Sequence, residues 1–600
     1  MGRPLSAIIS AMTLVGLLLL ATLAAISLTV VWETVDVQRT AQPAAGQDQP
    51  QAPATVVVAT GVSQGSDTLA PAEPALSLSK EPALSLSKEP ALSLSKDPVP
   101  TARLPGATAI PFPAPTPGPA PTPFPAASQN PRFGIAWSSS MYNSQRVALP
   151  TGRAIEAGAS WDRWPMPWYL VEPHADGHFR WVQEDINFFL AATQDRPGHF
   201  DPGSNGPVLN ILVVLTGIPE AYVRVREGRI ETILGLDEPA FLAGDGGDGQ
   251  ARINPENRWG HFVYQATSTF GDVVDGWEIG NEGGFPLPPA AYARAMEVAC
   301  QVIAITDPTA EVLLGSPVHP VVLETAQGKE TAYGALLRTL ATAVRGNRSL
   351  RACIGGLALH VYVRPDYSHY VISGIAELTA DLGWRPALWI TETGIQHPDR
   401  DGPGRARPDR CRETGFSCVS DEEQASYLIQ QYALAAQALA QKQRDGVVIY
   451  HRLKDEFDHD PRPEVNDGPW GLMDFDNGIL PAYNAARLVS ATLGGARYLR
   501  EEGTGDPTYR HLLFMGPSRR LVRVLWATTS EDVMVSVPLR SGQFICYQQD
   551  VAFCPGEFRH GTDGVLTLTL PGATAQARGD PGDPFYPAPV VGGRTFIVVE

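Results

Sequence analysis

The sequence has no excess of positive charge. Lysine and arginine number 46 against 64 aspartates and glutamates, the formal net charge is −18, and charged residues make up only 18% of the chain. A nucleic-acid partner requires a basic surface that neutralises phosphates, so no nucleic acid is expected to bind. The charge balance fits an enzyme that acts on a neutral ligand.

The motifs of several large enzyme classes are also missing. The chain contains no GxSxG, no HExxH and no Walker sequence, which disfavours the serine hydrolases, zinc peptidases and P-loop enzymes that carry them. Its six cysteines form no CxxC or Cys/His cluster, so no zinc site is predicted. We interpret the acidic residues Asp455, Glu456, Asp458 and Asp460 as a solvated loop in preference to a calcium site, and we expect no cofactor. The cysteines indicate structural disulfides in an oxidising compartment, with their pairing left open.

One long segment near the N-terminus has no ionisable side chain. It runs from Pro4 to Trp32, and Leu14–Val31 is almost continuously apolar. Such a helix can cross a hydrocarbon core of roughly 30 Å. Because Arg3 precedes the segment and Glu33 follows it, we expect residues 1–39 to be a transmembrane signal anchor that leaves the rest extracytoplasmic. A cleaved signal peptide, which would give a secreted protein, is the alternative.

Residues 40–130 have the composition of a disordered linker. They are rich in Pro, Ala, Ser and Thr, and the octapeptide Glu-Pro-Ala-Leu-Ser-Leu-Ser-Lys begins at Glu73, Glu81 and Glu89. Proline at this density excludes helix and ladder and favours a semi-extended spacer. We interpret the segment as a stalk without a functional site.

From Pro131 onward, strand-like segments alternate with amphipathic helical segments, which is typical of parallel βαβ units. Eight strands are predicted, at Phe133–Trp137, Gly158–Arg163, Leu209–Leu215, Val273–Ile279, Glu311–Gly315, Leu357–Val361, Ala387–Thr391 and Val447–Tyr450. Helices are predicted around Trp181–Ala192, Tyr292–Ile305, Tyr333–Val344 and Ala425–Lys442, the last preceded by a capping box at Ser420–Glu423. The pattern predicts an α/β fold in which residues 131–493 form a (β/α)8 TIM barrel.

The helical pattern stops after about Gly494. Four strands punctuated by Gly, Pro and Asp are predicted at Leu521–Ala527, Val533–Pro538, Val565–Leu570 and Arg594–Val599. These features predict that residues 494–600 form an antiparallel β-sandwich. The segment has no cluster of reactive side chains, so we expect it to pack against the barrel.

Two glutamates stand where predicted barrel strands end, Glu282 after Val273–Ile279 and Glu392 after Ala387–Thr391. Reactive groups of a parallel barrel collect at the C-terminal ends of its strands. Glycosidic cleavage needs two carboxyl groups, one that protonates the leaving oxygen and one that stabilises or captures the anomeric centre. We therefore interpret the two glutamates as a catalytic pair that hydrolyses a glycoside, oligosaccharide or polysaccharide.

The residues around both glutamates are similar to a known family. Trp277-Glu-Ile-Gly-Asn-Glu282 and Trp389-Ile-Thr-Glu-Thr-Gly394 resemble the strand-four and strand-seven signatures of glycoside hydrolase clan A, nearest to family 39. The resemblance extends from about Phe133 to Leu493. It implies a retaining glycosidase with Glu282 as acid/base and Glu392 as nucleophile.

The resemblance also implies residues that bind the sugar or position the nucleophile: Arg163, Asn281, His360 and Tyr362. Of these, the arginine is expected to hold the nucleophile ionised and the asparagine to bind the sugar 2-hydroxyl. Strand eight ends in Tyr450-His-Arg452 instead of the clan's frequent tryptophan, so Trp470, together with Trp137, is a candidate sugar platform. Glu278, earlier on strand four, is expected to form a structural ion pair.

A second function from another class is a carbohydrate-binding or cell-envelope scaffold on a degenerate barrel. A binding protein does not need an acid beside a nucleophile. The presence of both glutamates together with Arg163 and Asn281 therefore favours the enzyme.

Overall fold

The computed structural model describes only part of the chain. The described residues are 130–138, 150–182, 209–242, 252–282, 286–397, 399–400, 406–407, 419–455, 469–474, 476–503, 505–517, 519–540, 544–548, 559–560, 564–574 and 589–600. The expected anchor and linker, and nearly all of the predicted helix at Trp181–Ala192, lie outside these ranges. Within them, no helix combines the length and hydropathy needed to cross a membrane.

Eight parallel strands close into a barrel in the order β1-β14-β11-β10-β9-β8-β3-β2. Their bounds are Phe133–Ile135 for β1, Trp161–Pro167 for β2, Asn210–Thr216 for β3, Gly276–Ile279 for β8, Glu311–Leu314 for β9, Ile354–His360 for β10, Ala387–Thr393 for β11 and Val448–Tyr450 for β14. Each overlaps a predicted strand, which confirms the barrel. In sequence order, β8 is the fourth barrel strand and β11 is the seventh.

Apolar side chains cover both faces of the barrel strands. The strand β3 reads Asn-Ile-Leu-Val-Val-Leu-Thr, and all of its residues after Asn210 are buried. Leu212, Leu313 and Ile449 belong to a small separate core cluster, whereas Val213 and Leu215 pack in the large core that includes the surrounding helices. A strand buried on both faces becomes continuously apolar, as in other barrels of this kind.

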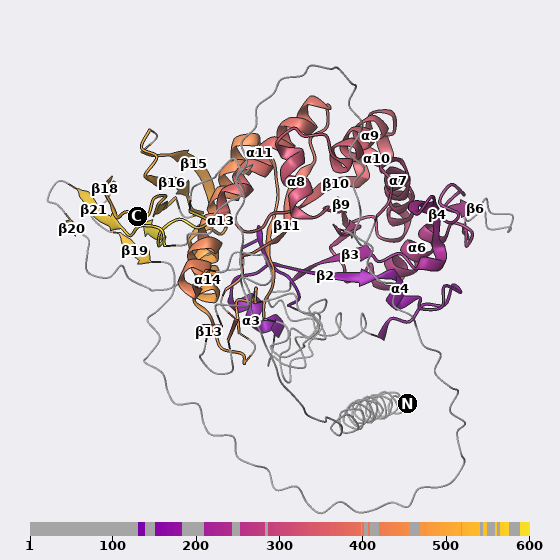
Figure 1. Cartoon of the computed structure of the whole chain (residues 1–600), viewed down its shortest axis with the longest axis horizontal. Coiled ribbons are helices and arrows are strands. Elements are labelled where there is room, and N and C mark those ends of the chain that lie inside the picture. Colours follow the sequence, from indigo (N-terminus) through magenta and orange to yellow (C-terminus); the bar gives the residue numbers. More distant parts are fainter. Residues whose placement is uncertain are drawn as a thin grey trace, which may run out of the picture. The chain divides into compact units, whose positions relative to one another are not determined.

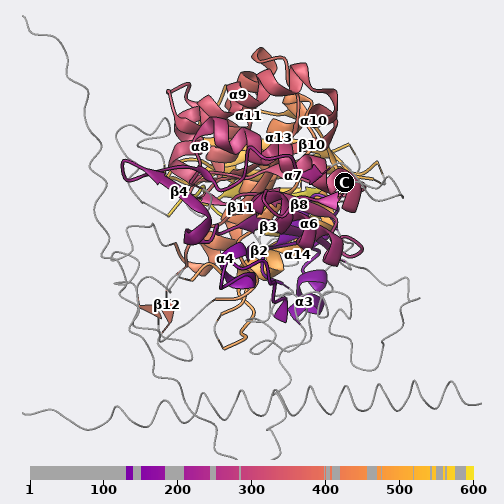
Figure 2. The same cartoon turned by 90° about the vertical axis from the view of Figure 1, so that its right-hand side faces the viewer.

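Helices follow most of the barrel strands (Figures 1 and 2). Three coincide with predicted helices: α7 (Pro289–Thr306), α9 (Ala332–Gly346) and α13 (Asp421–Lys442). The capping box at the start of α13 is confirmed, since Ser420 and Glu423 each accept a hydrogen bond from the other's backbone amide. Others were not predicted: α3 (Pro150–Glu156), α4 (Trp168–Val171), α6 (Arg258–Phe270), α8 (His319–Ala326), α10 (Arg348–Cys353), α11 (Pro365–Asp381) and α14 (Pro481–Leu493).

Two antiparallel sheets follow the barrel. The larger has the order β15-β16-β17-β22-β19 and the smaller β18-β21-β20. Their strands are β15 (Arg497–Glu501), β16 (Tyr509–Met515), β17 (Leu521–Ala527), β18 (Val533–Pro538), β19 (Ile545–Gln548), β20 (Arg559–His560), β21 (Val565–Leu570) and β22 (Phe596–Val599). Leu525, Val537 and Leu568 lie in one buried cluster to which both sheets contribute. The sheets therefore share a core, as expected for the predicted sandwich.

The helix α13 connects the barrel with the C-terminal sheets. Gln430 donates to the carbonyl of Gly593 at 3.0 Å and accepts from the amide of Gly592 at 3.0 Å. The adjacent Gln431 donates to the Thr393 hydroxyl on β11 at 2.6 Å. Both glutamines are buried, so their amides need these partners. One helix thus binds β11, the strand that carries Glu392, and the segment before β22 of the C-terminal sheets.

A disulfide joins Cys300 on α7 to Cys353 at the end of α10. This pair is one of those that the sequence left open. Three of the other cysteines, Cys411, Cys418 and Cys554, lie outside the described residues.

Candidate active site

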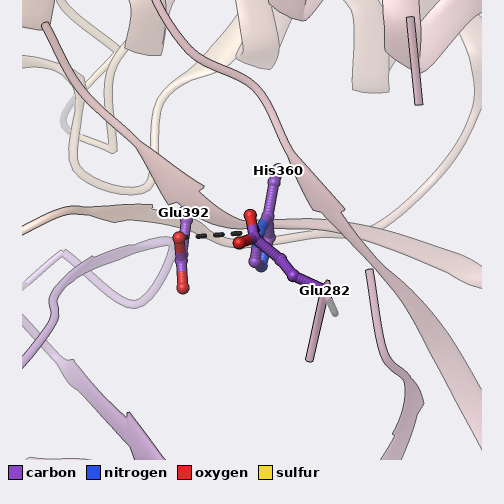
Figure 3. Close-up of side chains that lie close together, drawn as sticks. All are labelled: Glu282, His360 and Glu392. Carbon is purple, nitrogen blue, oxygen red and sulfur yellow. Dashed lines mark hydrogen bonds and ion pairs between the residues drawn. The ribbon is translucent and has the colours of Figure 1, made fainter. Parts of the chain in front are cut away.

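The two glutamates meet at the C-terminal ends of β8 and β11, as predicted. One carboxylate oxygen of Glu282, one of Glu392 and a ring nitrogen of His360 all lie within 4.8 Å of one another. The three side chains point toward one another from different strand ends (Figure 3). Glu282 has a φ of 40°, a left-handed conformation that is uncommon outside glycine and often occurs at functional sites.

Glu392 is held as a carboxylate by several donors. Its Oε1 accepts from Arg163 Nη1 at 2.6 Å, and its Oε2 accepts from the Tyr362 hydroxyl. Burial alone would raise the pKa of Glu392, but His360, Arg163 and His451, with the Tyr362 hydrogen bond, lower it well below its ordinary value. The side chain is 12% exposed and carries a negative charge at neutral pH.

Arg163 on β2 is the centre of the hydrogen-bond network. Besides Glu392, it donates from Nε and Nη2 to the two oxygens of Glu278 at 2.7 and 3.0 Å, and from Nη2 to Asn281 Oδ1 at 2.7 Å. Burial would lower the pKa of Arg163, but Glu278 and Glu392 raise it above its ordinary value. The guanidinium is therefore permanently charged, and the ion pair predicted for Glu278 is confirmed.

His360, at the end of β10, lies between the two glutamates. Its Nδ1 is 2.7 Å from Glu282 Oε1 and 3.5 Å from Glu392 Oε2, and its backbone amide donates to Ser316 Oγ at 2.9 Å. Burial would lower the pKa of His360, and Arg163 acts in the same direction, but the two carboxylates raise it above its ordinary value. The imidazole can therefore donate a proton or a hydrogen bond to Glu282 near neutral pH.

Asn281 is oriented by its bond to Arg163. A guanidinium has only donors, so the Asn281 atom at 2.7 Å must be the side-chain oxygen. The Asn281 amide nitrogen is then the end that can donate to another group. Such a donor suits a sugar hydroxyl oxygen.

The two tryptophans lie at different depths. Trp470 is 4% exposed, and its ring packs 5.1 Å from the ring of Tyr362. Trp137 is partly buried, and the Arg452 guanidinium lies over its ring, 5.3 Å from the ring centroid. The backbone amide of Trp137 donates a hydrogen bond to the Arg163 carbonyl. Both therefore adjoin the network, Trp470 through a side chain and Trp137 through the backbone.

Sequence reasoning missed two residues of the site. Ser316 accepts from the His360 amide and its carbonyl accepts from the Glu282 amide, which fixes both backbones. His451 contributes to the low pKa of Glu392 and packs against Trp470. Their positions directly after barrel strands were the available signal.

The interpretation of Asp455 as part of a solvated loop was wrong. Asp455 is buried, accepts from the Gly471 amide at 2.6 Å and lies 3.0 Å from His397 Nε2. It therefore anchors the backbone next to Trp470. Glu456, Asp458 and Asp460 lie outside the described residues.

Glu282, His360 and Glu392 also have the atom types of a metal site among the described residues. However, Arg163 lies 2.6 Å from Glu392 and 3.4 Å from His360 Nε2. A fixed positive charge this close to both groups opposes a second cation. The arrangement is better suited to acid, base and nucleophile chemistry.

No protein-family model matches the sequence, and no curated protein matches it. Among solved structures, it resembles a family 39 glycoside hydrolase from Bacteroides cellulosilyticus WH2, with 16% identity, a TM-score of 0.52 and coverage of 79% of this chain and 81% of the other. A glucosidase from Croceicoccus marinus (12% identity, TM-score 0.47, coverage 79% and 97%) and a conserved exported protein from Bacteroides fragilis (11%, 0.48, 79% and 98%) are also similar. The first likeness establishes a shared fold and confirms, for the fold, the resemblance to family 39.

Proposed function

We propose that this protein is a retaining glycoside hydrolase that cleaves O-glycosidic bonds by double displacement. The observation that carries the proposal is the approach of Glu282 and Glu392, whose carboxylate oxygens lie within 4.8 Å at the C-terminal end of a TIM barrel. Retaining enzymes hold their two carboxyl groups about 5 Å apart, whereas inverting enzymes leave room for a water molecule between them.

Glu392 suits the nucleophile because its surroundings keep it ionised. Arg163 and the Tyr362 hydroxyl each hold one of its oxygens, and its pKa lies well below the ordinary value. A carboxylate that never carries a proton at neutral pH can attack an anomeric carbon but cannot act as the acid.

Glu282 suits the acid/base. Its side chain is 33% exposed, which is more than the 12% of Glu392, and it bonds to His360, a group that can itself carry a proton. The acid/base must reach first the leaving oxygen and then a water molecule, so access to the bound substrate is required of it.

In the proposed reaction, a Glu392 oxygen bonds to the anomeric carbon while the bond to the leaving oxygen breaks and Glu282 gives that oxygen its proton. In the second step Glu282 takes a proton from water, the water oxygen bonds to the anomeric carbon, and the bond to Glu392 breaks. Asn281 donates to a sugar hydroxyl throughout. The substrate is a glycoside, oligosaccharide or polysaccharide, and the reaction draws on no cofactor.

The nucleophile is tested by Glu392→Gly on an aryl glycoside that the wild type hydrolyses. Turnover should be abolished, and added azide should enter the vacated space and give a glycosyl azide of inverted configuration, detected by NMR of the anomeric proton. If this variant keeps the wild-type rate, or if the wild-type enzyme inverts configuration, the assignment is wrong.

The acid/base is tested by Glu282→Ala on the same substrates. Glycosides with good leaving groups should still react with Glu392, whereas those with poor leaving groups should lose roughly 10²–10⁴-fold in rate. Azide should then attack the accumulated intermediate and give a product of retained configuration. Equal losses for good and poor leaving groups would contradict the role of Glu282.

We also propose that the catalytic part is held outside the cytoplasmic membrane by residues 1–39. The support is the apolar run Leu14–Val31 behind Arg3. Protease added to intact cells should cut the stalk and release an active fragment. A protease-protected enzyme would exclude this location.

A further inference from the structure

A third carboxylate binds the same guanidinium as Glu392. Glu278 on β8 is completely buried, and both of its oxygens bind Arg163, at 2.7 Å to Nε and 3.0 Å to Nη2. Two parallel bonds fix the plane of a guanidinium as well as its position. Glu278 occupies the Nε and Nη2 side of the guanidinium. Nη1 then donates to Glu392, and the second hydrogen of Nη2 donates to Asn281.

The charges of this cluster change during a double displacement. Before reaction, one buried guanidinium is shared by two carboxylates, Glu278 and Glu392. When Glu392 becomes a glycosyl ester, it loses its negative charge. Glu282 has then given up its proton, so the new negative charge lies on Glu282, beside His360. Arg163, only 2% exposed, would then be a buried cation without a carboxylate if Glu278 were absent.

We propose that Glu278 is a positioning residue that keeps Arg163 paired while Glu392 is esterified. This inference rests on the proposed retaining mechanism. Glu278 binds Arg163 through both of its oxygens and acts through the guanidinium. Because an uncompensated buried charge is costly, Glu278 lowers the free energy of the glycosyl-enzyme relative to the free enzyme.

The consequence is selective for one chemical step. Forming the Glu392 ester removes a partner of Arg163, so losing Glu278 should slow this step. Hydrolysis of the ester restores the Glu392 carboxylate beside Arg163, so losing Glu278 should not slow the second step. A residue that only supports the fold would not distinguish between the two steps.

The test is Glu278→Gln in the full-length protein. A panel of 2,4-dinitrophenyl pentosides, hexosides and hexuronides first identifies the sugar that the wild type hydrolyses fastest. Both proteins are then assayed on that substrate by stopped flow. We expect kcat/KM, which reports ester formation, to fall by roughly 100-fold. The pre-steady-state burst of dinitrophenolate should disappear because ester formation becomes slower than hydrolysis. A burst of wild-type amplitude with unchanged kcat/KM would overturn the proposal.

Two further variants separate positioning from stability. Glu278→Asp keeps the charge and should retain the burst even if kcat/KM falls, so it remains informative if Glu278→Gln does not fold. Glu172→Gln is the matched control, since Glu172 is also a buried carboxylate but accepts from Trp168 and Tyr222, both at 2.6 Å, outside the catalytic network. It should lower thermal stability and preserve the burst. Loss of the burst in Glu278→Asp, or in the control, would refute the charge argument.

The proposed function and the role of Glu278 are refuted by different results. If the wild type hydrolyses no glycoside in the panel, the proposed function fails. If the wild type shows a burst and Glu278→Gln lowers kcat/KM and kcat by the same factor while keeping that burst, only the role of Glu278 fails.

Discussion

Replacing Arg163 with methionine should weaken the pH dependence of stability that Glu392 contributes. The change keeps a long unbranched side chain but leaves Glu278 and Glu392 without their common cation, which binds them at 2.7 and 2.6 Å in the wild type. Breaking a buried pair from one side costs about 3–5 kcal/mol. With an unfolding entropy of about 2.1 cal/mol/K per residue over the roughly 360 described residues, this loss corresponds to a decrease in Tm of about 4–7 °C at neutral pH.

Stability changes with pH because the folded and unfolded states bind different numbers of protons. In the wild type, the folded pKa of Glu392 lies below its ordinary value of 4.5, so its stabilisation is present above pH 4.5 and is lost as the pH falls. In Arg163→Met, the pKa of Glu392 should rise, because burial still raises it and only His360, His451 and the Tyr362 hydroxyl remain to lower it. The variant should therefore gain less stability than the wild type as the pH rises from 4.5 toward 7.

Differential scanning calorimetry of both proteins between pH 4 and 7.5 measures this effect without a substrate. The difference in Tm should be small near pH 4 and largest near pH 7. Tyr362→Phe removes a hydroxyl from the same site without removing a charge, and it is the control for local repacking. A difference in Tm that is constant with pH, or larger at pH 4, would refute the proposed electrostatic role of Arg163.

Three other outcomes are expected. Tyr362→Phe removes a hydrogen bond to a charged oxygen, worth about 1.5–3 kcal/mol, so kcat/KM should fall by about 10- to 150-fold. An unchanged rate would exclude a role for the hydroxyl. Replacing both Cys300 and Cys353 with serine opens a loop that joins residues 53 positions apart. The free energy of unfolding, measured by urea denaturation, should fall by about 4 kcal/mol. A loss below about 1 kcal/mol would contradict this expectation. Removing residues 1–130 should change turnover of a small aryl glycoside by less than about tenfold, since the linker composition offers no site.

The barrel was predictable because its strands are distinctive in sequence. Segments such as Asn210–Thr216 and Ala387–Thr393 are short, largely apolar and rich in β-branched residues, and the barrel strands recur between helical stretches. The helix α11 was missed because Pro365–Asp381 mixes apolar residues with tyrosines, serines and a histidine, which weakens the helical periodicity. Only the packing of α11 in the structure shows which of its side chains are buried.

The candidate site was predictable in its residue types but not in its connections. The strand ends identified Glu282 and Glu392, and the clan resemblance added Arg163. The sequence could not show that Glu278 and Glu392 share one guanidinium, because that contact joins residues 115 and 229 positions away from Arg163. It also misjudged Asp455, because an acidic run looks solvated until the loop that covers it is known.

The glutamine contacts of α13 also affect how the protein folds during synthesis. Gln430 finds its partner at Gly593, 163 residues later in the chain. Until the segment around residues 592–595 has been synthesised, α13 lacks this contact. Contacts of such sequence separation delay folding. Nascent chains released before residue 590 should thus be protease-sensitive at α13, and resistance at that stage would show that the barrel matures alone.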